Sequence, residues 1–354
     1  LPESILVLDS NVFRCSTYSH GNASSITELR FMGDAPSIAS DAFTSVTATA
    51  SYSAENPTWT EDMFRDYGGA ITWYPDPSIP ATGTTDVVTV VDSGSCGEEA
   101  IWELNSLGKL IVSGSGEMTS YPWRADYAKV IKQVVIEEGI TSICSSAFSG
   151  CSSMTHVDIP DTVTEIGGHA FENCTSLESV VVPEGVRYLE WWVFGSCTNL
   201  KNVTLPSTLE YFNASPFTSS NNIENVYITD LEAWCRLDFE SAALTYDNLI
   251  LNGTAVTELV IPEGITSVSS YAFDYWTNLE TVTIPESVTS IGTNAFQGCE
   301  NLREVNLSNG ITALHSYVFA ECHALTHLTL PESILVLDSN VFRCSTYSHG
   351  NASS

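Results

Sequence analysis

Basic side chains are scarce in this sequence. Among 354 residues, 12 Lys and Arg stand against 43 Asp and Glu, which gives a formal net charge of −31. Proteins that bind nucleic acid neutralise phosphates with a basic surface, and basic segments also draw proteins to anionic lipids. The charge balance argues against both kinds of partner, and we interpret the acidic residues as a solvated surface.

Long apolar runs are absent as well. No stretch reaches the roughly 20 apolar residues that a membrane-spanning helix requires, and no basic segment followed by a short apolar run marks a signal peptide. We therefore predict no insertion into a membrane. The sequence does not begin with Met, so we expect a mature product, a fragment or a part of a longer chain.

Catalytic and cofactor motifs are missing too. The sequence contains no H-E-x-x-H, no G-x-S-x-G, no phosphate-loop pattern and no G-x-G-x-x-G after a strand. We therefore predict that the protein is not an enzyme and that it uses no cofactor.

What the sequence does contain is an internal repeat. Each unit is 23 residues long and begins at an apolar residue. The units begin at Val134, Val157, Val180, Val203, Leu259, Val282, Val305 and Leu328. Their shared pattern is V-x-I-P-x-x-V-x-x-I-x-x-x-A-F-x-x-C-x-x-L.

This pattern indicates a coil with one short strand at its start. V-x-I alternates with a period of two residues, and the Pro that follows ends the strand because it has no N–H to donate. A single unit cannot bury its own apolar side chains, whereas stacked units can. The sequence therefore predicts a β-rich solenoid of 23-residue coils, whose parallel strands stack about 4.8 Å apart.

Five of the ten cysteines occupy the eighteenth position of their units. They are Cys151, Cys174, Cys197, Cys299 and Cys322. Ser220 and Trp276 fill the same position in two other units, which indicates packing rather than metal ligation. We therefore predict a buried ladder of unpaired thiols. Cys96, Cys144 and Cys235 lie off this ladder, and a disulfide between two of them remains open.

The units closely resemble the BspA-like, Treponema-type leucine-rich repeat family. The resemblance is carried by VDIPDTVTEIGGHAFENC (157–174) and VTIPESVTSIGTNAFQGC (282–299), in which Pro, I-G, A-F and Cys recur at fixed offsets. Two units depart from it: the first lacks the Pro (VNLSNGITAL, 305–314), and the second lacks I-G and A-F (LEYFNASPF, 209–217). The resemblance implies a leucine-rich repeat array on a secreted or surface protein, with adhesion or matrix roles and no catalysis.

Three segments outside the regular units also resemble parts of such proteins. Residues 31–75 resemble the end of an array, residues 93–123 resemble an N-terminal cap, and residues 226–258 resemble an insert between coils. The predicted order is the end of an array (1–52), a C-terminal cap element (53–75), a linker (76–86), an N-terminal β cap (87–125), leucine-rich repeats (126–225), the insert (226–258) and further repeats (259–354). The strand-like DVVTVVDSG (86–94) either belongs to its own cap or pairs with a neighbouring module.

One string occurs twice. Residues 1–25 and residues 330–354 are both LPESILVLDSNVFRCSTYSHGNASS, whereas the units at Val157 and Val282 agree at only 11 of 23 places. In the first copy, the next residue, Ile26, supplies the apolar side chain that completes the coil. We therefore expect one period of a head-to-tail tandem polymer, with a repeat of 329 residues. A recent natural duplication and an engineered or misassembled chain are the alternatives.

Candidate sites are confined to the surface. Sequons for N-glycosylation occur at Asn22, Asn173, Asn202, Asn213, Asn252, Asn306 and Asn351. Of these, Asn22 and Asn252 have the best expected access, and Asn173 the worst because it adjoins Cys174. The pattern C-H-x-x-x-H, from Cys322 to His327, is interpreted as part of a coil rather than as a metal site.

Aromatic residues on variable positions of neighbouring coils form a candidate interaction surface. They are Tyr188, Trp191, Tyr211, Tyr271 and Tyr275. We predict an extracellular or cell-surface structural protein whose main partner is another copy of itself. The alternative is an adhesin that binds a host or matrix protein or a carbohydrate through this surface.

Overall fold

The computed structural model describes residues 88–213, 215–239, 244 and 246–344, and, nearer the N-terminus, residues 7–8, 28–31, 35–38, 43, 46–53, 59–60, 63–65, 67 and 70–75. The chain divides into two compact units, Leu1–Val88 and Thr89–Ser354. The predicted linker (76–86) lies outside the described residues.

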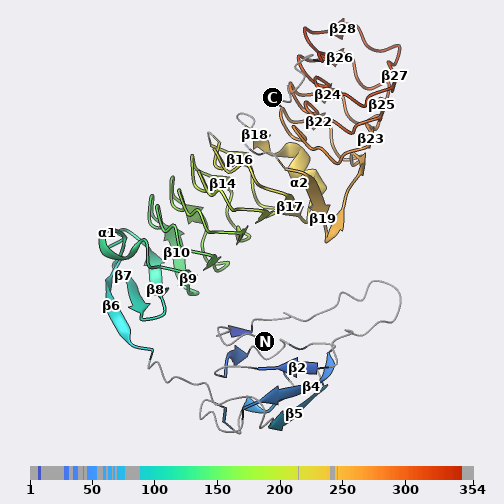
Figure 1. The fold of residues 1–354 in the computed structure, drawn as a ribbon. Coiled ribbons are helices and arrows are strands. Elements are labelled where there is room, and N and C mark those ends of the chain that lie inside the picture. Colours follow the sequence, from blue (N-terminus) through green and yellow to red (C-terminus); the bar gives the residue numbers. More distant parts are fainter. Residues whose placement is uncertain are drawn as a thin grey trace, which may run out of the picture. The chain divides into compact units, whose positions relative to one another are not determined.

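The second unit is a β-solenoid, so the predicted fold class is confirmed. Each regular coil consists of a first strand, a turn, a second strand and a series of tight turns that lead to the next coil (Figure 1). The first strands pair in parallel, and the register advances by one unit: Val180 pairs with Val203, and Val203 pairs with Val226. Equivalent residues of successive coils therefore lie directly above one another.

The two strands of the coils lie on different sides of the solenoid (Figure 1). The first strands are β9 (Gln133–Ile136), β11 (His156–Asp158), β13 (Ser179–Val181), β15 (Asn202–Thr204), β17 (Asn225–Ile228), β19 (Asn248–Leu251), β21 (Glu258–Val260), β23 (Thr281–Thr283), β25 (Glu304–Asn306) and β27 (His327–Thr329). The second strands are β10 (Ile140–Ile143), β12 (Glu165–Ile166), β14 (Tyr188–Leu189), β16 (Tyr211–Phe212), β18 (Asp238–Phe239), β22 (Ser267–Val268), β24 (Ser290–Ile291), β26 (Ala313–Leu314) and β28 (Val336–Leu337).

Stacked phenylalanine rings run through the core. The ring centroids of Phe148 and Phe171 lie 5.3 Å apart, and those of Phe171 and Phe194 are also 5.3 Å apart, with interplanar angles of 14° and 7°. Trp123 begins this column by stacking on Phe148, and Phe217 ends it. A second column contains Phe273, Phe296, Phe319 and Phe342. The A-F pair of the repeat therefore supplies one ring per coil to the core.

The cysteines at the eighteenth position line the core beside the rings, and each is at most 4% exposed. From the second of them on, each thiol donates to the carbonyl of the Phe in the preceding coil, as Cys197 Sγ does to Phe171 O at 3.2 Å. Ser220 Oγ makes the same bond to Phe194 O at 2.7 Å, which explains why Ser replaces Cys there. All nine described cysteines are unpaired, including Cys96 and Cys144.

These thiols are expected to be inert in the native protein. Burial raises the pKa of Cys151 and of Cys197 to about 12, so very little thiolate forms near neutral pH. Cys344 is exposed and is expected to react first among the described cysteines. Alkylation with iodoacetamide at pH 8, followed by peptide mass spectrometry, measures this order. Modification of Cys197 before the chain unfolds would contradict it.

Left-handed backbone recurs at two corners of each coil. The thirteenth position has positive φ throughout, in Ser146, His169, Trp192, Ser215, Tyr271, Asn294, Tyr317 and Asn340. The seventeenth position does so as well, in Gly150, Asn173, Ser196, Ser219, Tyr275, Gly298 and Glu321. Most of these residues are neither Gly nor Asn, so stacking of the coils rather than local preference holds the corners.

The start of the array is covered by three antiparallel strands, β6 (Val90–Ser95), β7 (Glu99–Asn105) and β8 (Lys109–Glu117). β6 pairs with β7, so of the two pairings left open for this segment the structure shows the one within its own cap. β8 pairs along its first part with β9 and near its end with β10, and thus covers both strands of the first coil. A short helix, α1 (Arg124–Tyr127), leads into the array.

The predicted insert takes part in the solenoid. β17 and β19 pair in register with Asn225 opposite Asn248, and a hairpin joins β19 to β20 (Thr254–Ala255). Between β17 and β19 lies α2 (Leu231–Arg236). Asp230 caps this helix, because its carboxylate accepts hydrogen bonds from the N–H groups of Glu232 and Ala233 in the first turn. Trp234 Nε1 donates to Ala272 O at 2.9 Å, so the helix is attached to the coil that follows.

The first unit contains β1 (Val7–Leu8), β2 (Glu28–Arg30), β3 (Ser37–Ile38), β4 (Thr47–Tyr52) and β5 (Ala70–Pro75). β1 and β3 pair in parallel, as do β2, β4 and β5. An aromatic cluster that includes Phe31, Trp59 and Trp73 packs against the strands. The unit thus shows the parallel strand pairing expected for coils.

Candidate functional site

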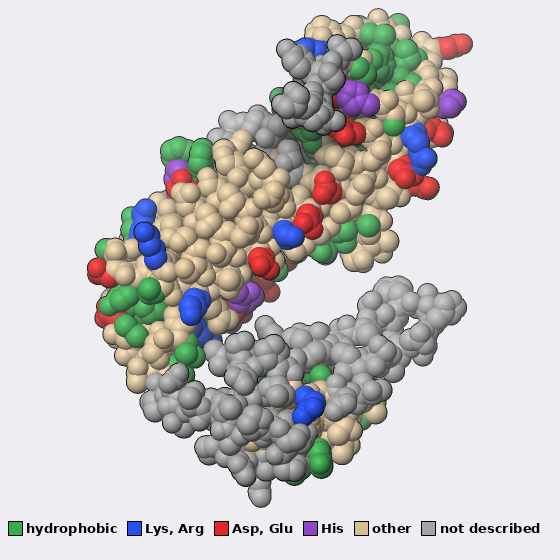
Figure 2. All heavy atoms as spheres, in the orientation of Figure 1, with side chains coloured by type: hydrophobic (Ala, Val, Ile, Leu, Met, Phe, Trp, Pro, Cys, Tyr) green, Lys and Arg blue, Asp and Glu red, His purple; other side chains and the backbone are tan. Residues whose placement is uncertain are grey.

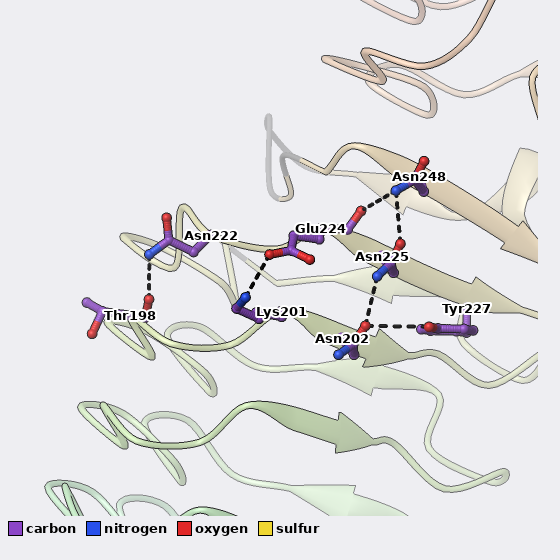
Figure 3. A network of polar contacts seen from close by, with 8 residues as sticks. All are labelled: Thr198, Lys201, Asn202, Asn222, Glu224, Asn225, Tyr227 and Asn248. Carbon is purple, nitrogen blue, oxygen red and sulfur yellow. Dashed lines mark hydrogen bonds and ion pairs between the residues drawn. The ribbon is translucent and has the colours of Figure 1, made fainter.

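A row of asparagine side chains runs along the first strands of the middle coils (Figure 3). Asn225 Nδ2 donates to Asn202 Oδ1 at 2.9 Å, and Asn248 Nδ2 donates to Asn225 Oδ1 at 2.9 Å. Asn278 Nδ2 continues the row to Asn248 Oδ1 at 2.6 Å. Because a carboxamide both donates and accepts, the in-register stacking of Asn202, Asn225 and Asn248 forms a continuous ladder of half-buried amides.

A recess of about 520 Å³ opens beside this ladder. We call it the polar recess; it is lined by Thr198, Asn199, Lys201, Asn221, Asn222, Ile223, Glu224, Tyr246, Asp247, Tyr275 and Thr277. Most of these are exposed carboxamide, hydroxyl or charged residues, while Ile223 and Tyr246 are buried. Its size lies within the range of about 300–1,000 Å³ that is typical of small-molecule sites.

The recess forms where the regular spacing of the coils breaks. Asn278 occupies the coil position of Asn222 and Asn301, whose side chains donate to a backbone oxygen 24 residues earlier, whereas Asn278 donates to Asn248, 30 residues earlier. Thr277 Oγ1 and Asp247 Oδ1 are joined across the same break, at 3.3 Å. The break lies at the hairpin after β19, because β20 ends the ladder that contains β13 to β19 and a separate ladder begins at β21.

Charges in the recess largely neutralise one another. Lys201 Nζ lies 3.0 Å from Glu224 Oε1 of the next coil, and both side chains are about half exposed (Figure 3). An exposed pair of this kind contributes little to stability. With Asp247 also present, the recess offers no unneutralised positive charge to an anionic ligand.

Three polar groups are buried without a partner near the floor of the recess. In the described part of the chain, the Tyr246 hydroxyl, Asp274 Oδ1 and Trp276 Nε1 make no hydrogen bond. Burial raises the pKa of Asp274 to about 8, so its carboxyl is neutral at pH 7. Burial, with Cys299, Asp274 and Cys235 nearby, also raises the pKa of Tyr246.

The predicted aromatic surface is distributed over several places. Tyr188 and Tyr211 stack with centroids 5.4 Å apart, and the Trp191 ring packs edge-on against that of His169 at 4.6 Å. Tyr275 lines the polar recess, and Tyr271 packs half-buried against the core. Among the described residues, no ring contact joins the Tyr188 pair to Tyr275, so sequence reasoning did not group the residues that share a site.

The predicted sequons differ in access. Asn173, Asn252 and Asn306 are exposed, the first of them despite its neighbour Cys174. Asn202 Oδ1 belongs to the amide ladder, and Asn213 Nδ2 donates to Glu190 at 2.8 Å. Two further predicted acceptors, Asn22 and Asn351, lie outside the described residues. Glycosylation at any of these positions stays a prediction.

The residues of the C-H-x-x-x-H pattern have separate partners. Cys322 Sγ donates to Phe296 O, His323 Nε2 lies 3.4 Å from Glu321, and His327 Nδ1 contacts Thr326 Oγ1 at 2.9 Å. Within the described ranges, no three His, Cys, Asp or Glu side chains gather in a way that would hold a metal ion.

Sequence reasoning missed the polar recess, although one signal for the ladder was present. Asn precedes the first apolar residue of the strand at positions 202, 225 and 248, each 23 residues after the last.

The repeat pattern of the coils also matches a known family. A model of the BspA type leucine-rich repeat region matches residues 125–241 and 247–353, with six copies. The chain belongs to the BspA-type leucine-rich repeat family.

Solved structures of other leucine-rich repeat proteins are similar to this BspA-type array. One from Eubacterium ventriosum is 19% identical over 74% of this chain and 97% of its own, with a TM-score of 0.34. A leucine-rich cell surface protein from Faecalibacterium prausnitzii is 22% identical over 72% and 86%, with a TM-score of 0.37. The leucine-rich repeat protein of T. pallidum is 20% identical over 66% and 91%, with a TM-score of 0.35.

A search of curated proteins gives no significant match. As for membranes, the helices in the described part of the chain are all too short or too polar to cross one.

Proposed function

We propose that this chain is a module of an extracellular or cell-surface structural protein in which modules join head to tail. The observation that carries the proposal is a strand that occurs in both copies of the duplicated string. Val7–Leu8 and Val336–Leu337 have the same sequence surroundings and are both β-strands, β1 and β28. β1 pairs with a strand that comes later in the chain, whereas β28 pairs with a strand that comes before it.

In the first copy, the strand pairs with a coil later in the chain: Val7 lies opposite Ser37. In the second copy, it pairs with the coil before it: Val336 lies opposite Ala313. An interior coil of a solenoid pairs on both sides. The two pairings are those that one interior coil would make with its two neighbours, and they support a coil like that of residues 29–52 following β28 in the assembled protein.

Within the described residues, the coil that carries β28 also has more exposed apolar side chains than the coil before it. Leu337 is 49% exposed, whereas its equivalent one coil earlier, Leu314, is 0% exposed. Phe342 is 41% exposed, whereas Phe319 is 1% exposed. Hydrophobic side chains gather at this end of the array, where β28 lies (Figure 2). A head-to-tail contact that does not close into a ring generates a filament.

Assembly of the purified chain tests this proposal. Concentration-dependent growth in analytical ultracentrifugation, with fibres in electron micrographs, is expected from the parent chain. Leu337→Asp places a charge on the uncovered coil and is expected to abolish growth, whereas Val260→Asp, on an exposed strand position, is the matched control. A parent chain that stays monomeric at every concentration would overturn non-covalent joining, and a native mass near 38.4 kDa would overturn covalent joining.

Adhesion is the second candidate function. It is supported by the polar recess and by exposed aromatic rings, Trp191, Tyr211 and Tyr275, which are 52%, 39% and 39% exposed. Rings of this kind are enriched where proteins bind partners. Measuring the attachment of the labelled chain to host cells and to immobilised matrix proteins tests this function, and attachment to neither would contradict it.

A further inference from the structure

We propose that the polar recess binds a neutral oligosaccharide, with Tyr275 as the ring on which a sugar unit stacks and with Asn199 and Asn221 as its hydrogen-bonding partners. This binding rests on the adhesive function proposed above. It does not depend on head-to-tail assembly.

The recess holds polar groups that the protein itself leaves unused. Asn199 and Asn221 are exposed and line the recess, and their side chains make no hydrogen bond within the described part of the chain. Asn222, by contrast, donates from Nδ2 to Thr198 O at 2.6 Å (Figure 3). Each free carboxamide offers two donor hydrogens and an acceptor oxygen. A sugar hydroxyl, which donates and accepts at once, matches that set.

The Tyr275 ring is held in place before any ligand arrives. It lies so close to Gly298 that a Cβ atom there would come within 2.5 Å of Tyr275 Cδ1. Its hydroxyl accepts a hydrogen bond from Gln297 Nε2 at 3.1 Å, and the side chain is still 39% exposed. A ring that is already ordered loses little entropy when it binds, and it offers an apolar face to the C–H groups of a sugar.

The charges and edges of the recess narrow the class of ligand. Lys201 is paired with Glu224, and Asp247 adds a negative charge, so phosphorylated or sulfated ligands are disfavoured. An extended peptide commonly binds to an open strand edge. The strands beside the recess are paired on both sides: β17 lies between β15 and β19, and β19 lies between β17 and β20. A neutral, hydroxyl-rich ligand fits best.

Titration of the purified full chain with cellotetraose, maltotetraose and chitotriose, followed by calorimetry, tests the site. Saturable binding of at least one probe is expected. Tyr275→Ala is expected to weaken it about tenfold, the scale of one lost ring contact. Asn221→Ala is expected to weaken it too, while Tyr275→Phe retains most of it. The matched control is Tyr74→Ala, because Tyr74 is an exposed tyrosine of the first unit that does not line the recess.

The site would be overturned if none of the three probes binds. It would also be overturned if Tyr275→Ala has the melting temperature of the parent chain and binds the probe equally well. Attachment to host cells before and after enzymatic removal of their glycans separates this outcome from failure of adhesion itself. Attachment that persists after glycan removal and in Tyr275→Ala leaves the adhesive function standing and removes the sugar site. If the chain attaches neither to host cells nor to immobilised matrix proteins, the adhesive function itself is contradicted.

Discussion

The Asp274→Asn variant is expected to be more stable than the parent chain at pH 8 and to have lost part of its pH dependence. Asp274 is 3% exposed, and burial raises the pKa of its carboxyl from 3.8 to about 8. The folded chain therefore keeps this proton up to about pH 8, whereas the unfolded chain releases it near pH 4. The carboxylate is favoured only in the unfolded chain.

The sign of the effect follows from proton linkage. Between pH 4 and pH 8 the folded state binds more protons at this group, so raising the pH lowers the free energy of unfolding by about 1.4 kcal/mol per unit. The stabilisation is complete below the unfolded pKa and is lost as the pH rises through the folded pKa. Asn cannot ionise, so the variant lacks this slope.

Urea unfolding of both chains at intervals from pH 4 to pH 8.5 measures their free energies of unfolding. Subtracting one from the other cancels the contribution of the many other carboxyl groups. Asp247→Asn is the matched control, because Asp247 is exposed and its carboxylate accepts a hydrogen bond from the hydroxyl of Thr277. Parallel curves for the parent and Asp274→Asn would show that the carboxyl is ionised in the folded protein, and would contradict the burial that the structure shows.

The second large effect is expected from Phe171→Ala. This ring is 0% exposed and stacks on Phe148 and Phe194 at 5.3 Å on either side. Truncation leaves a cavity in the middle of the column, which typically costs about 3–5 kcal/mol. Both stacked contacts are lost as well. Because each coil is supported by its neighbours, the damage is expected to reach the coils on both sides.

Phe342→Ala serves as the matched comparison. Phe342 occupies the same position of its coil and stacks on Phe319 at 6.2 Å, but it is 41% exposed. Its truncation is expected to cost much less. Thermal unfolding followed by circular dichroism measures both variants, and equal losses in the two would show that the column does not carry the stability of the array.

The repeat by itself predicted the solenoid fold and the register in which its coils stack. Once Val180 and Val203 are 23 residues apart and in equivalent positions, parallel in-register pairing follows, and so does the stacking of Phe171 on Phe194. Ser220 and Trp276 at the Cys position indicated packing, and the structure adds that Ser220 Oγ makes the same bond to a carbonyl as the Cys197 thiol. Periodic apolar positions are the strongest signal that a sequence carries.

The insert was harder to interpret. Residues 226–258 resemble an insert between coils, and the Pro, I-G and A-F landmarks are missing there. The structure nevertheless places Val226 and Leu249 in the first-strand ladder, since their apolar spacing of 23 residues is retained. The helix α2 takes the place of the usual turn, and the hairpin of β19 and β20 then ends this ladder of first strands.

The sequence alone determined the coil length, the register and the columns of Phe and Cys, because a short-range apolar pattern repeats and only stacking can bury it. Only the tertiary structure decided the left-handed corners at residues such as His169 and Trp192, where local preference opposes the conformation that packing imposes. It also decided that Asn199, Asn221 and Tyr275 share one recess. Asn199 and Asn221 lie on neighbouring coils of one ladder, whereas Tyr275 belongs to the next ladder and reaches the recess where the stacking breaks.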